Sequence, residues 1–403
     1  MEWTREQKHI VIACFLGWML DAFDFFLMVF ILHDIAQEFV TPISSVALAL
    51  TLTLAMRPVG AVIFGRISDK YGRRPAMMWC VALYSGLEFL SGFSPNLVIL
   101  LILRALFGVA MGGEWGVGAA LTMESIPAKS RGIISGILQA GYPVGYLVAS
   151  IVFGIFHDSF GWRGMFFIGV LPALLVLYIR SKVVESPAME PAKKSAPETN
   201  LIVSLQQHWK LAIYVILLMT AFNFFSHGTQ DMYPTFLEVQ HHFNTHTVSI
   251  IAIIANLGAI AGAFIFGALS QRIGRRRAIA LAAVLSLPIL PLWAYSSTML
   301  MLAIGGFLMQ VMVQGAWGVV PVHLNELSPP EIRGTFPGVT YQFGNLLAAG
   351  NATIQSGVAQ HYGGNYSLAL AMTAGIFAVV IAVLALLGRE NHSIAMVEQY
   401  SAP

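Results

Sequence analysis

The sequence predicts an all-α membrane protein with twelve transmembrane helices in two pseudo-symmetric six-helix bundles. Three observations support this fold class: an apolar composition, a series of long apolar runs, and an internal repeat that aligns the two halves of the chain. Hydrophobic residues make up 57% of the 403 residues and charged residues only 10%, whereas a soluble domain carries roughly a quarter charged residues. The composition therefore favours a protein that lies in lipid.

About a dozen apolar runs are long enough to cross a hydrocarbon core of about 30 Å, which takes roughly 20 helical residues. We expect helices, because backbone polar groups must be paired inside lipid and these runs lack the alternation of barrel strands. The first run has no small-residue cleavage site, so we interpret it as a retained helix. The predicted spans are 10–32, 44–66, 75–93, 97–121, 132–156, 161–180, 211–237, 246–269, 277–295, 299–323, 335–358 and 366–388.

Lysine and arginine residues gather on one side of the predicted helices. With the N-terminus in the cytoplasm, all 22 except Arg57, Arg104 and Arg163 fall on cytoplasmic loops, tails or helix ends. Cytoplasmic loops of membrane proteins carry an excess of these residues. We therefore expect a multi-pass protein of the cell membrane, the bacterial inner membrane, with both termini in the cytoplasm.

An internal repeat with a constant offset of 202 residues aligns the two halves, so that 65–74 falls on 267–276. Such halves are related by an axis along the membrane normal and bind substrate near the midplane between them. We expect an N-terminal bundle over 1–185, a polar, proline-rich cytoplasmic linker over 186–207, and a C-terminal bundle over 208–403. Further on, Gly113, Trp115, Glu124 and Arg131 fall on Gly315, Trp317, Glu326 and Arg333.

The segment 65–74, with its echo at 267–276, resembles the loop signature between the second and third helices of the major facilitator superfamily. In that family the acid of this loop and the arginines after it join the cytoplasmic ends of the two halves in the outward-open state. The resemblance therefore implies gating roles for four residues, or, as the alternative, charges that only mark the positive cytoplasmic surface. The repeat puts Gln271 in place of the acid, so we expect a weaker contact there. The four residues are Asp69, Arg73, Glu124 and Arg131.

Few ionisable residues lie inside the predicted spans, where each costs roughly 2.5 kcal/mol or more. Asp21 and Asp24 lie on one face of span 1, and we expect Asp24 to pair with Arg104 of span 4. A carboxylate that loses its arginine partner in an apolar environment takes up a proton, so a conformational change can load and unload one. The alternative is a permanent structural ion pair. Arg57 in span 2 and Glu114 in span 4 complete this set.

Two short patterns give these charges a family context. The motif Asp21-Ala-Phe-Asp24 resembles the acidic motif of proton-coupled sugar and aromatic-acid symporters, which implies proton-coupling roles for Asp24, Arg104 and Asp21. The pattern Arg-Pro-x-Gly at 57–60 resembles organic-acid symporters, and a guanidinium can hold a carboxylate with two parallel donors. Arg57 is therefore a candidate substrate-binding residue. The alternative is that Arg57 pairs with Asp21 or Asp24 and never touches substrate.

A polar stripe marks span 7, because its polar residues recur at the spacing of one helix face. The string 223–235 resembles the span-7 signature of fungal lactate and pyruvate permeases, and together with 112–116 in span 4 it resembles the monocarboxylate branch of the sialate:proton symporter family. The resemblance implies substrate-binding roles for the stripe. Tyr142 and Tyr341 are further candidates, although buried polar groups often only join helices. The stripe comprises Asn223, Ser226, His227, Gln230 and Asp231.

Together these features predict a secondary transporter that carries a small monocarboxylate, such as lactate or pyruvate, with protons by alternating access. A larger organic acid (sialate, an aromatic acid or a dicarboxylate), a sugar porter and a non-translocating receptor are the alternatives. The sequence has no phosphate loop, metal cluster or nucleophile–base set, so we expect no enzyme, and no cofactor or metal besides the coupling proton. The expected partners are the carboxylate and the lipid bilayer, without nucleic acid, and the expected state is a monomer.

Overall fold

The computed structural model describes residues 3–41, 43–187, 201–233, 236–392, 394 and 396. All regular secondary structure in these residues is helical, and ten helices are long and apolar enough to cross a membrane. The predicted fold class, an all-α membrane protein, is therefore confirmed. Of the other two predicted spans, 75–93 forms a helix that contains Glu88, and 335–358 is divided into two shorter helices.

The first half of the chain forms the first six predicted spans. Span 5 and the beginning of span 6 form one continuous helix with a kink at Gly161, whose φ of 63° and ψ of −175° are not helical. A glycine tolerates this conformation because it has no Cβ. The helices are α1 (Arg5–Phe30), α2 (Leu32–Glu38), α3 (Ile43–Tyr71), α4 (Arg73–Ser91), α5 (Leu97–Ser125), η1 (Ala128–Ser130), α6 (Arg131–Ile168) and α7 (Ala173–Lys182).

The second half repeats this order with more interruptions. Pro288 lies where span 9 changes to a short 3-10 helix, as expected for a residue without a backbone N–H. The helices are α9 (Leu201–Gln207), α10 (Trp209–Gln230), η2 (Phe236–Gln240), α12 (Thr245–Ile273), α13 (Arg275–Ser286), η3 (Leu287–Ile289), α14 (Leu290–Tyr295), α15 (Met299–Leu327), η4 (Pro330–Ile332), α16 (Phe336–Ala348), α17 (Asn351–His361) and α18 (Tyr366–Leu387).

Two of these helices differ from the predicted boundaries in ways that concern the site. The α10 helix ends at Gln230, earlier than the predicted limit of 237, and Asp231 is its C-cap. Residues 188–200 of the predicted linker lie outside the described residues, whereas its last part, 201–207, forms α9. The polar stripe of span 7 therefore reaches the end of α10.

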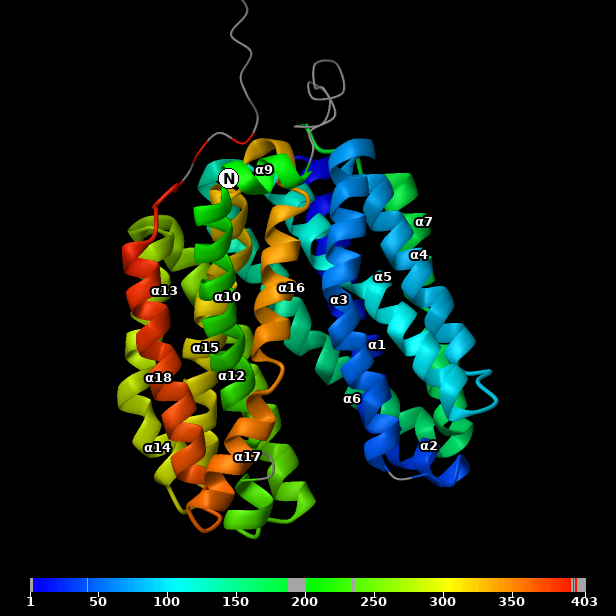
Figure 1. The fold of residues 1–403 in the computed structure, drawn as a ribbon, viewed down its shortest axis with the longest axis vertical. Coiled ribbons are helices and arrows are strands. Elements are labelled where there is room, and N and C mark those ends of the chain that lie inside the picture. Colours follow the sequence, from blue (N-terminus) through cyan, green and yellow to red (C-terminus); the bar gives the residue numbers. More distant parts are fainter. Residues whose placement is uncertain are drawn as a thin grey trace, which may run out of the picture.

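The helices form two groups, α1–α7 and α10–α18, that lie side by side (Figure 1). Contacts between the groups join α3, α5 and α6 to α12, α15 and α16. In Figure 1 the groups converge at the end that carries α9 and diverge towards the end that carries α2 and α17. We call the convergent end the basic end, because the Arg73–Arg74 and Arg275–Arg277 segments lie there.

Glycines set the distance between the long helices of each half. A Cβ added to Gly60 on α3 would lie 1.8 Å from the carbonyl oxygen of Val109 on α5. The equivalent atom on Gly262 of α12 would lie 2.1 Å from the carbonyl oxygen of Val311 on α15. Both residues of each pair are related by the 202-residue offset, so the same packing recurs in the two halves. Small residues allow such close approach between membrane helices.

Candidate functional site

Arg57 on α3 carries a buried positive charge with unused donors. Its Nη2 lies 3.9 Å from Oδ2 of Asp21 on α1, and its guanidinium lies 5.9 Å from the ring centroid of Trp18. Neither Nε nor Nη2 donates a hydrogen bond to any described residue. The contact with Asp21 is too long for a hydrogen bond. These two donors therefore remain available to an anion.

The charge of Arg57 also reaches the other half of the molecule. It acts electrostatically on His227 on α10 and Tyr341 on α16. Its backbone is held by close packing, because a Cβ on Gly112 of α5 would lie 2.0 Å from the Arg57 carbonyl oxygen. The Arg57 backbone is therefore held against α5, and its charge acts on side chains of the second half.

The predicted ion pair between Asp24 and Arg104 is not formed in this conformation. Nη1 of Arg104 pairs instead with Oε2 of Glu88 on α4, and both side chains are fully buried. The carboxylate oxygens of Asp24 make no hydrogen bond to a described residue, although Arg104 and Glu88 both act on it electrostatically. The reason is geometric: α4 and α5 follow one another through a short loop, which places Glu88 beside Arg104. An acid inside predicted span 3 was the signal that the sequence analysis missed.

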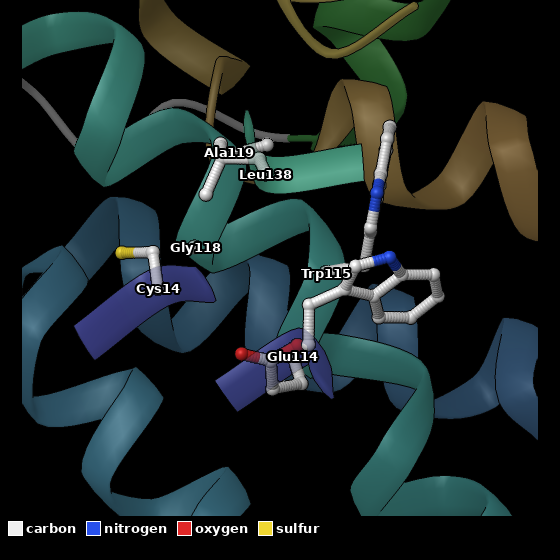
Figure 2. Close-up of a pocket in the computed structure, with 7 residues that line it drawn as sticks. Cys14, Glu114, Trp115, Gly118, Ala119 and Leu138 are labelled. Atoms are coloured by element: carbon white, nitrogen blue, oxygen red, sulfur yellow. The ribbon is translucent and has the colours of Figure 1, made fainter. Parts of the chain in front are cut away.

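Glu114 on α5, like Asp21 and Asp24, is a buried carboxylate without a hydrogen-bond partner among the described residues. It lines a small pocket between α1, α5 and α6, together with Cys14, Trp18, Trp115 and Leu138. Figure 2 shows its carboxylate and the Trp115 indole extending from neighbouring positions of α5 in different directions. A Cβ on Gly17 would lie 2.2 Å from Glu114 Oε1. The carboxylate therefore occupies the space that a glycine on α1 leaves open.

The polar stripe of α10 contacts two other helices of the second half. Nδ1 of His227 lies 3.1 Å from Oδ1 of Asp231, and its Nε2 lies 3.3 Å from Oδ1 of Asn345 on α16. Nε2 of Gln230 donates to Oε1 of Gln310 on α15 at 2.9 Å. Asn223 instead donates to its own helix, at the carbonyl oxygen of Met219. The structure thus brings His227 and Asp231 into one hydrogen-bonded group with Asn345, whereas Gln230 bonds to Gln310 and Asn223 to its own helix.

Aromatic side chains connect the two halves. Trp18 lies 5.4 Å from Tyr142 and 6.5 Å from Trp115, between ring centroids. Trp115 lies 4.9 Å from Tyr341, which lies 5.5 Å from Trp317. The indole N–H groups of Trp18 and Trp317 donate to no described residue. This aromatic row includes both predicted tyrosines. The 202-residue offset between Trp115 and Trp317 was the signal for these two tryptophans.

The predicted gating residues lie at the basic end. Asp69 accepts hydrogen bonds across the halves from the Gly334 N–H at 2.8 Å and the Thr335 hydroxyl at 2.5 Å. Arg73 pairs with Asp69 at 2.6 Å and with Glu124 at 2.9 Å. Asp69, Arg73 and Glu124 therefore form one network that crosses between the halves.

The second half repeats this network with an amide. Gln271 accepts from the Gly132 N–H at 3.0 Å and donates to the Ala128 carbonyl oxygen at 3.0 Å, so it also crosses between the halves. The amide supplies a donor that a carboxylate lacks. Arg131 lies apart from the carboxylates and donates to the carbonyl oxygens of Met123 and Ile394.

Comparison with known proteins identifies the family. The family model described as Major Facilitator Superfamily matches residues 14–248, and the one described as Sugar (and other) transporter matches 199–391. The sialic acid transporter NanX of Escherichia coli is 31% identical over 375 residues, which cover 91% of each chain. The chain belongs to the major facilitator superfamily. It is therefore a multi-pass membrane transporter, and the recognised family is confirmed.

Three further comparisons place this superfamily member among its relatives. A Saccharomyces cerevisiae protein named as a carboxylic acid transporter protein homolog is 29% identical over 400 residues, and the chain spans 64% of its length. The proton:xylose symporter XylE has the same fold, with a TM-score of 0.77 at 18% identity over 96% of this chain and 97% of that one. The human organic anion transporter MFSD10 has a TM-score of 0.73 at 17% identity, over 94% and 99%.

Proposed function

We propose that this transporter carries a small monocarboxylate, of the size of lactate or pyruvate, together with a proton. The observation that carries the proposal is the buried Arg57 guanidinium, whose Nε and Nη2 donate to no described residue. A guanidinium with free parallel donors suits a carboxylate, because the charge-assisted pair of hydrogen bonds fixes both its charge and its orientation.

In the proposed mechanism Arg57 holds the substrate carboxylate, and His227, Gln230 and Asn223 contribute hydrogen bonds from the second half. The proton travels on Asp24, which is buried without a hydrogen-bond partner among the described residues. One anion and one proton make the transported pair neutral, so the cycle moves no net charge. The two halves rock around the site and expose it alternately to each side.

The same proposal includes the setting of the protein. The basic end faces the cytoplasm, in agreement with the excess of Lys and Arg on cytoplasmic loops. The membrane is a bacterial inner membrane, and the transporter works as a monomer with no cofactor besides the proton.

A larger organic acid is the second candidate substrate. It is favoured by the relative NanX, which is named for sialic acid. The aromatic row favours the smaller or planar acid, because indole and phenol rings offer apolar faces and few partners for a polyhydroxylated sugar acid. A sugar porter is favoured only by the second family model, whose description names sugars.

Uptake into proteoliposomes tests the proposal. Radiolabelled lactate should accumulate when the outside is made acidic, and a protonophore should abolish the accumulation. A competition panel of pyruvate, sialate, benzoate, succinate and xylose then identifies the substrate class. Accumulation that survives the protonophore would contradict proton coupling. Inhibition by xylose alone would contradict a carboxylate substrate.

A further inference from the structure

Away from the basic end, six described Asp, Glu and Arg side chains lie buried within the membrane helices of the first half, and none has a charged counterpart in the repeat. Four are carboxylic acids and two are arginines. The N-terminal half therefore carries its own charge system, which its partner half does not copy. By the 202-residue offset, Asp21, Asp24, Arg57, Glu88, Arg104 and Glu114 fall on Asn223, Ser226, Ala259, Leu290, Gly306 and Ala316.

The two arginines can neutralise only two of the four acids. Arg57 lies nearest Asp21, and Arg104 pairs with Glu88. Asp24 and Glu114 are left buried without an arginine, and neither carboxylate accepts a hydrogen bond from a described residue. An unpaired carboxylate costs several kcal/mol in such a place, and it becomes neutral instead by binding a proton. In this conformation Asp24 therefore holds a proton while Glu88 is ionised. Glu114 stays neutral by the same reasoning and takes no part in the exchange argued below.

The surroundings of Asp24 contain a second acid within reach of the same arginine. Arg104 on α5 and Glu88 on α4 both act electrostatically on Asp24, and so does Asp21 on its own helix. Asp24 also acts electrostatically on Tyr84 of α4, whose hydroxyl donates to no described residue. No other charged group among the described residues acts on Asp24 to a comparable extent. The arginine thus has two alternative carboxylate partners.

We propose that Arg104 exchanges between Asp24 and Glu88 during transport, and that a proton moves between the two acids in the opposite direction. In one state ionised Asp24 pairs with Arg104 and Glu88 carries the proton. In the other state, the one described here, ionised Glu88 pairs with Arg104 and Asp24 carries the proton. The cluster has the same net charge in both states, so neither state leaves an unpaired charge in the apolar interior.

This inference rests on the proposed proton coupling and adds Glu88 as a second carrier of the transported proton. Glu88 lies near the end of α4 away from the basic end, because α4 runs from Arg73 to Ser91. Asp24 lies in the same part of the molecule, near the end of α1. A proton that enters from the side away from the basic end can therefore bind Glu88 first and then pass to Asp24.

The substitution Glu88→Gln tests the exchange. Without an acid at position 88, Arg104 pairs with Asp24 permanently, and an arginine neighbour keeps a carboxylate ionised to lower pH by about one to three units. The pH of half-maximal uptake should shift to the acid side by that amount. Glu88→Asp, which keeps the acid, should restore most of the profile. Glu38→Gln, a change of the same kind on α2 outside the charge system, should leave it unchanged.

Infrared spectroscopy of the purified protein gives a readout that does not depend on transport. The wild type should show the carbonyl stretch of a protonated carboxylic acid that Asp24→Asn removes, and Glu88→Gln should remove the same band at neutral pH. A band that persists in Glu88→Gln, or an unshifted uptake profile, would overturn the exchange. Proton-independent uptake by the wild type would instead overturn the proposed function, and the infrared result would still decide whether Glu88 controls the Asp24 proton.

Discussion

At the scale of residues, Arg57 combines a fixed charge with a place between the halves. Its contacts with Asp21 and Trp18 lie within the first half. Its charge also acts electrostatically on His227 and Tyr341 of the second half. A ligand held there touches both halves at once. Binding energy at such a point can bias the conformational equilibrium, because it differs between the open and closed arrangements.

Replacing Arg57 with lysine should weaken substrate binding while keeping the charge. A lysine offers a point charge and loses the planar pair of donors. Hydrogen bonds to charged groups contribute about 1.5–3 kcal/mol, so we expect KM for the carboxylate to rise roughly 10- to 100-fold in uptake measurements. Arg163→Lys is the control, because Arg163 contacts Glu38 outside the site. An unchanged KM in Arg57→Lys would show that Arg57 does not bind the substrate.

Glu38 gives a prediction on pH outside the membrane helices. The hydrogen bond from Arg163 lowers the pKa of the Glu38 carboxyl below its ordinary value, and a second from the Trp162 indole acts in the same direction against partial burial. Because the folded-state pKa is depressed, the ion pair stabilises the fold above the unfolded-state pKa and is lost as pH falls through the folded-state value.

The substitution Arg163→Gln should therefore raise the pKa of Glu38 towards its ordinary value. Trp162 lies 2.6 Å from the carboxylate, so its fluorescence should follow the titration, with Glu38→Gln as the baseline. An identical midpoint in Arg163→Gln and wild type would contradict this assignment.

The sequence located most of these charges but could not assign their partners. Asp21, Asp24, Arg57 and Arg104 stand out because ionisable residues are rare inside apolar runs. Which carboxylate pairs with Arg104 depends on how α1 and α4 are rotated against α5. The spacing of residues within one helix does not predict either rotation. Arg104 pairs with Glu88 because the short connection between α4 and α5 places the two residues at a similar depth along their helices.

At the scale of elements, glycines hold the helices that carry the site. Besides Gly112 against Arg57, a Cβ on Gly108 of α5 would lie 2.2 Å from the carbonyl oxygen of Thr53 on α3. The backbones of α3 and α5 therefore touch along several turns. The position of the Arg57 guanidinium depends on this contact, since any separation of the helices moves its Cα.

The substitution Gly112→Ala should displace α3 from α5. Overpacking of this kind typically costs about 1–3 kcal/mol, and here the strain falls on the Arg57 backbone. We expect a lower Tm in detergent and loss of most uptake. Gly86→Ala on α4 is the matched control, because a Cβ there meets nothing within 4 Å. Equal behaviour of the two variants would contradict the packing argument.

Apolar runs predicted the number and order of the membrane segments but not their interruptions. The break in span 9 coincides with Pro288, a residue from which the break could have been predicted. The break between α16 and α17 falls at Ala349 and Gly350 in a run of small residues, which has the same hydropathy whether the helix continues or stops. Hydropathy also does not predict the end of α10 at Gln230, because the residues on both sides of this end are polar and belong to one motif.

At the scale of the whole molecule, two related networks join the halves at the basic end. Each combines an arginine, an acid on the fourth span of its half (α5 or α15) and a side chain that reaches the opposite half. One crossing side chain is the anion Asp69 and the other is the neutral Gln271. The pairs Arg73–Glu124 and Arg275–Glu326 are related by the 202-residue offset. The symmetry of the sequence therefore extends to the contacts, although the crossing side chain is charged only in the first half.

The substitution Asp69→Asn should favour opening at the basic end. It removes the charge from the hydrogen bonds to the Gly334 N–H and the Thr335 hydroxyl, and such charge-assisted bonds contribute about 1.5–3 kcal/mol. Since 1.4 kcal/mol is about a factor of ten in an equilibrium, the open population should rise about tenfold or more. Pulsed electron paramagnetic resonance between spin labels at Tyr71 and Arg277, with Cys14 and Cys80 replaced by serine, measures the distance distribution between the halves at this end.

The control is Glu331→Gln, which removes a charge at the same end from a contact with His208 within one half. A distance distribution that is the same in Asp69→Asn and Glu331→Gln would mean that Asp69 does not hold the halves together.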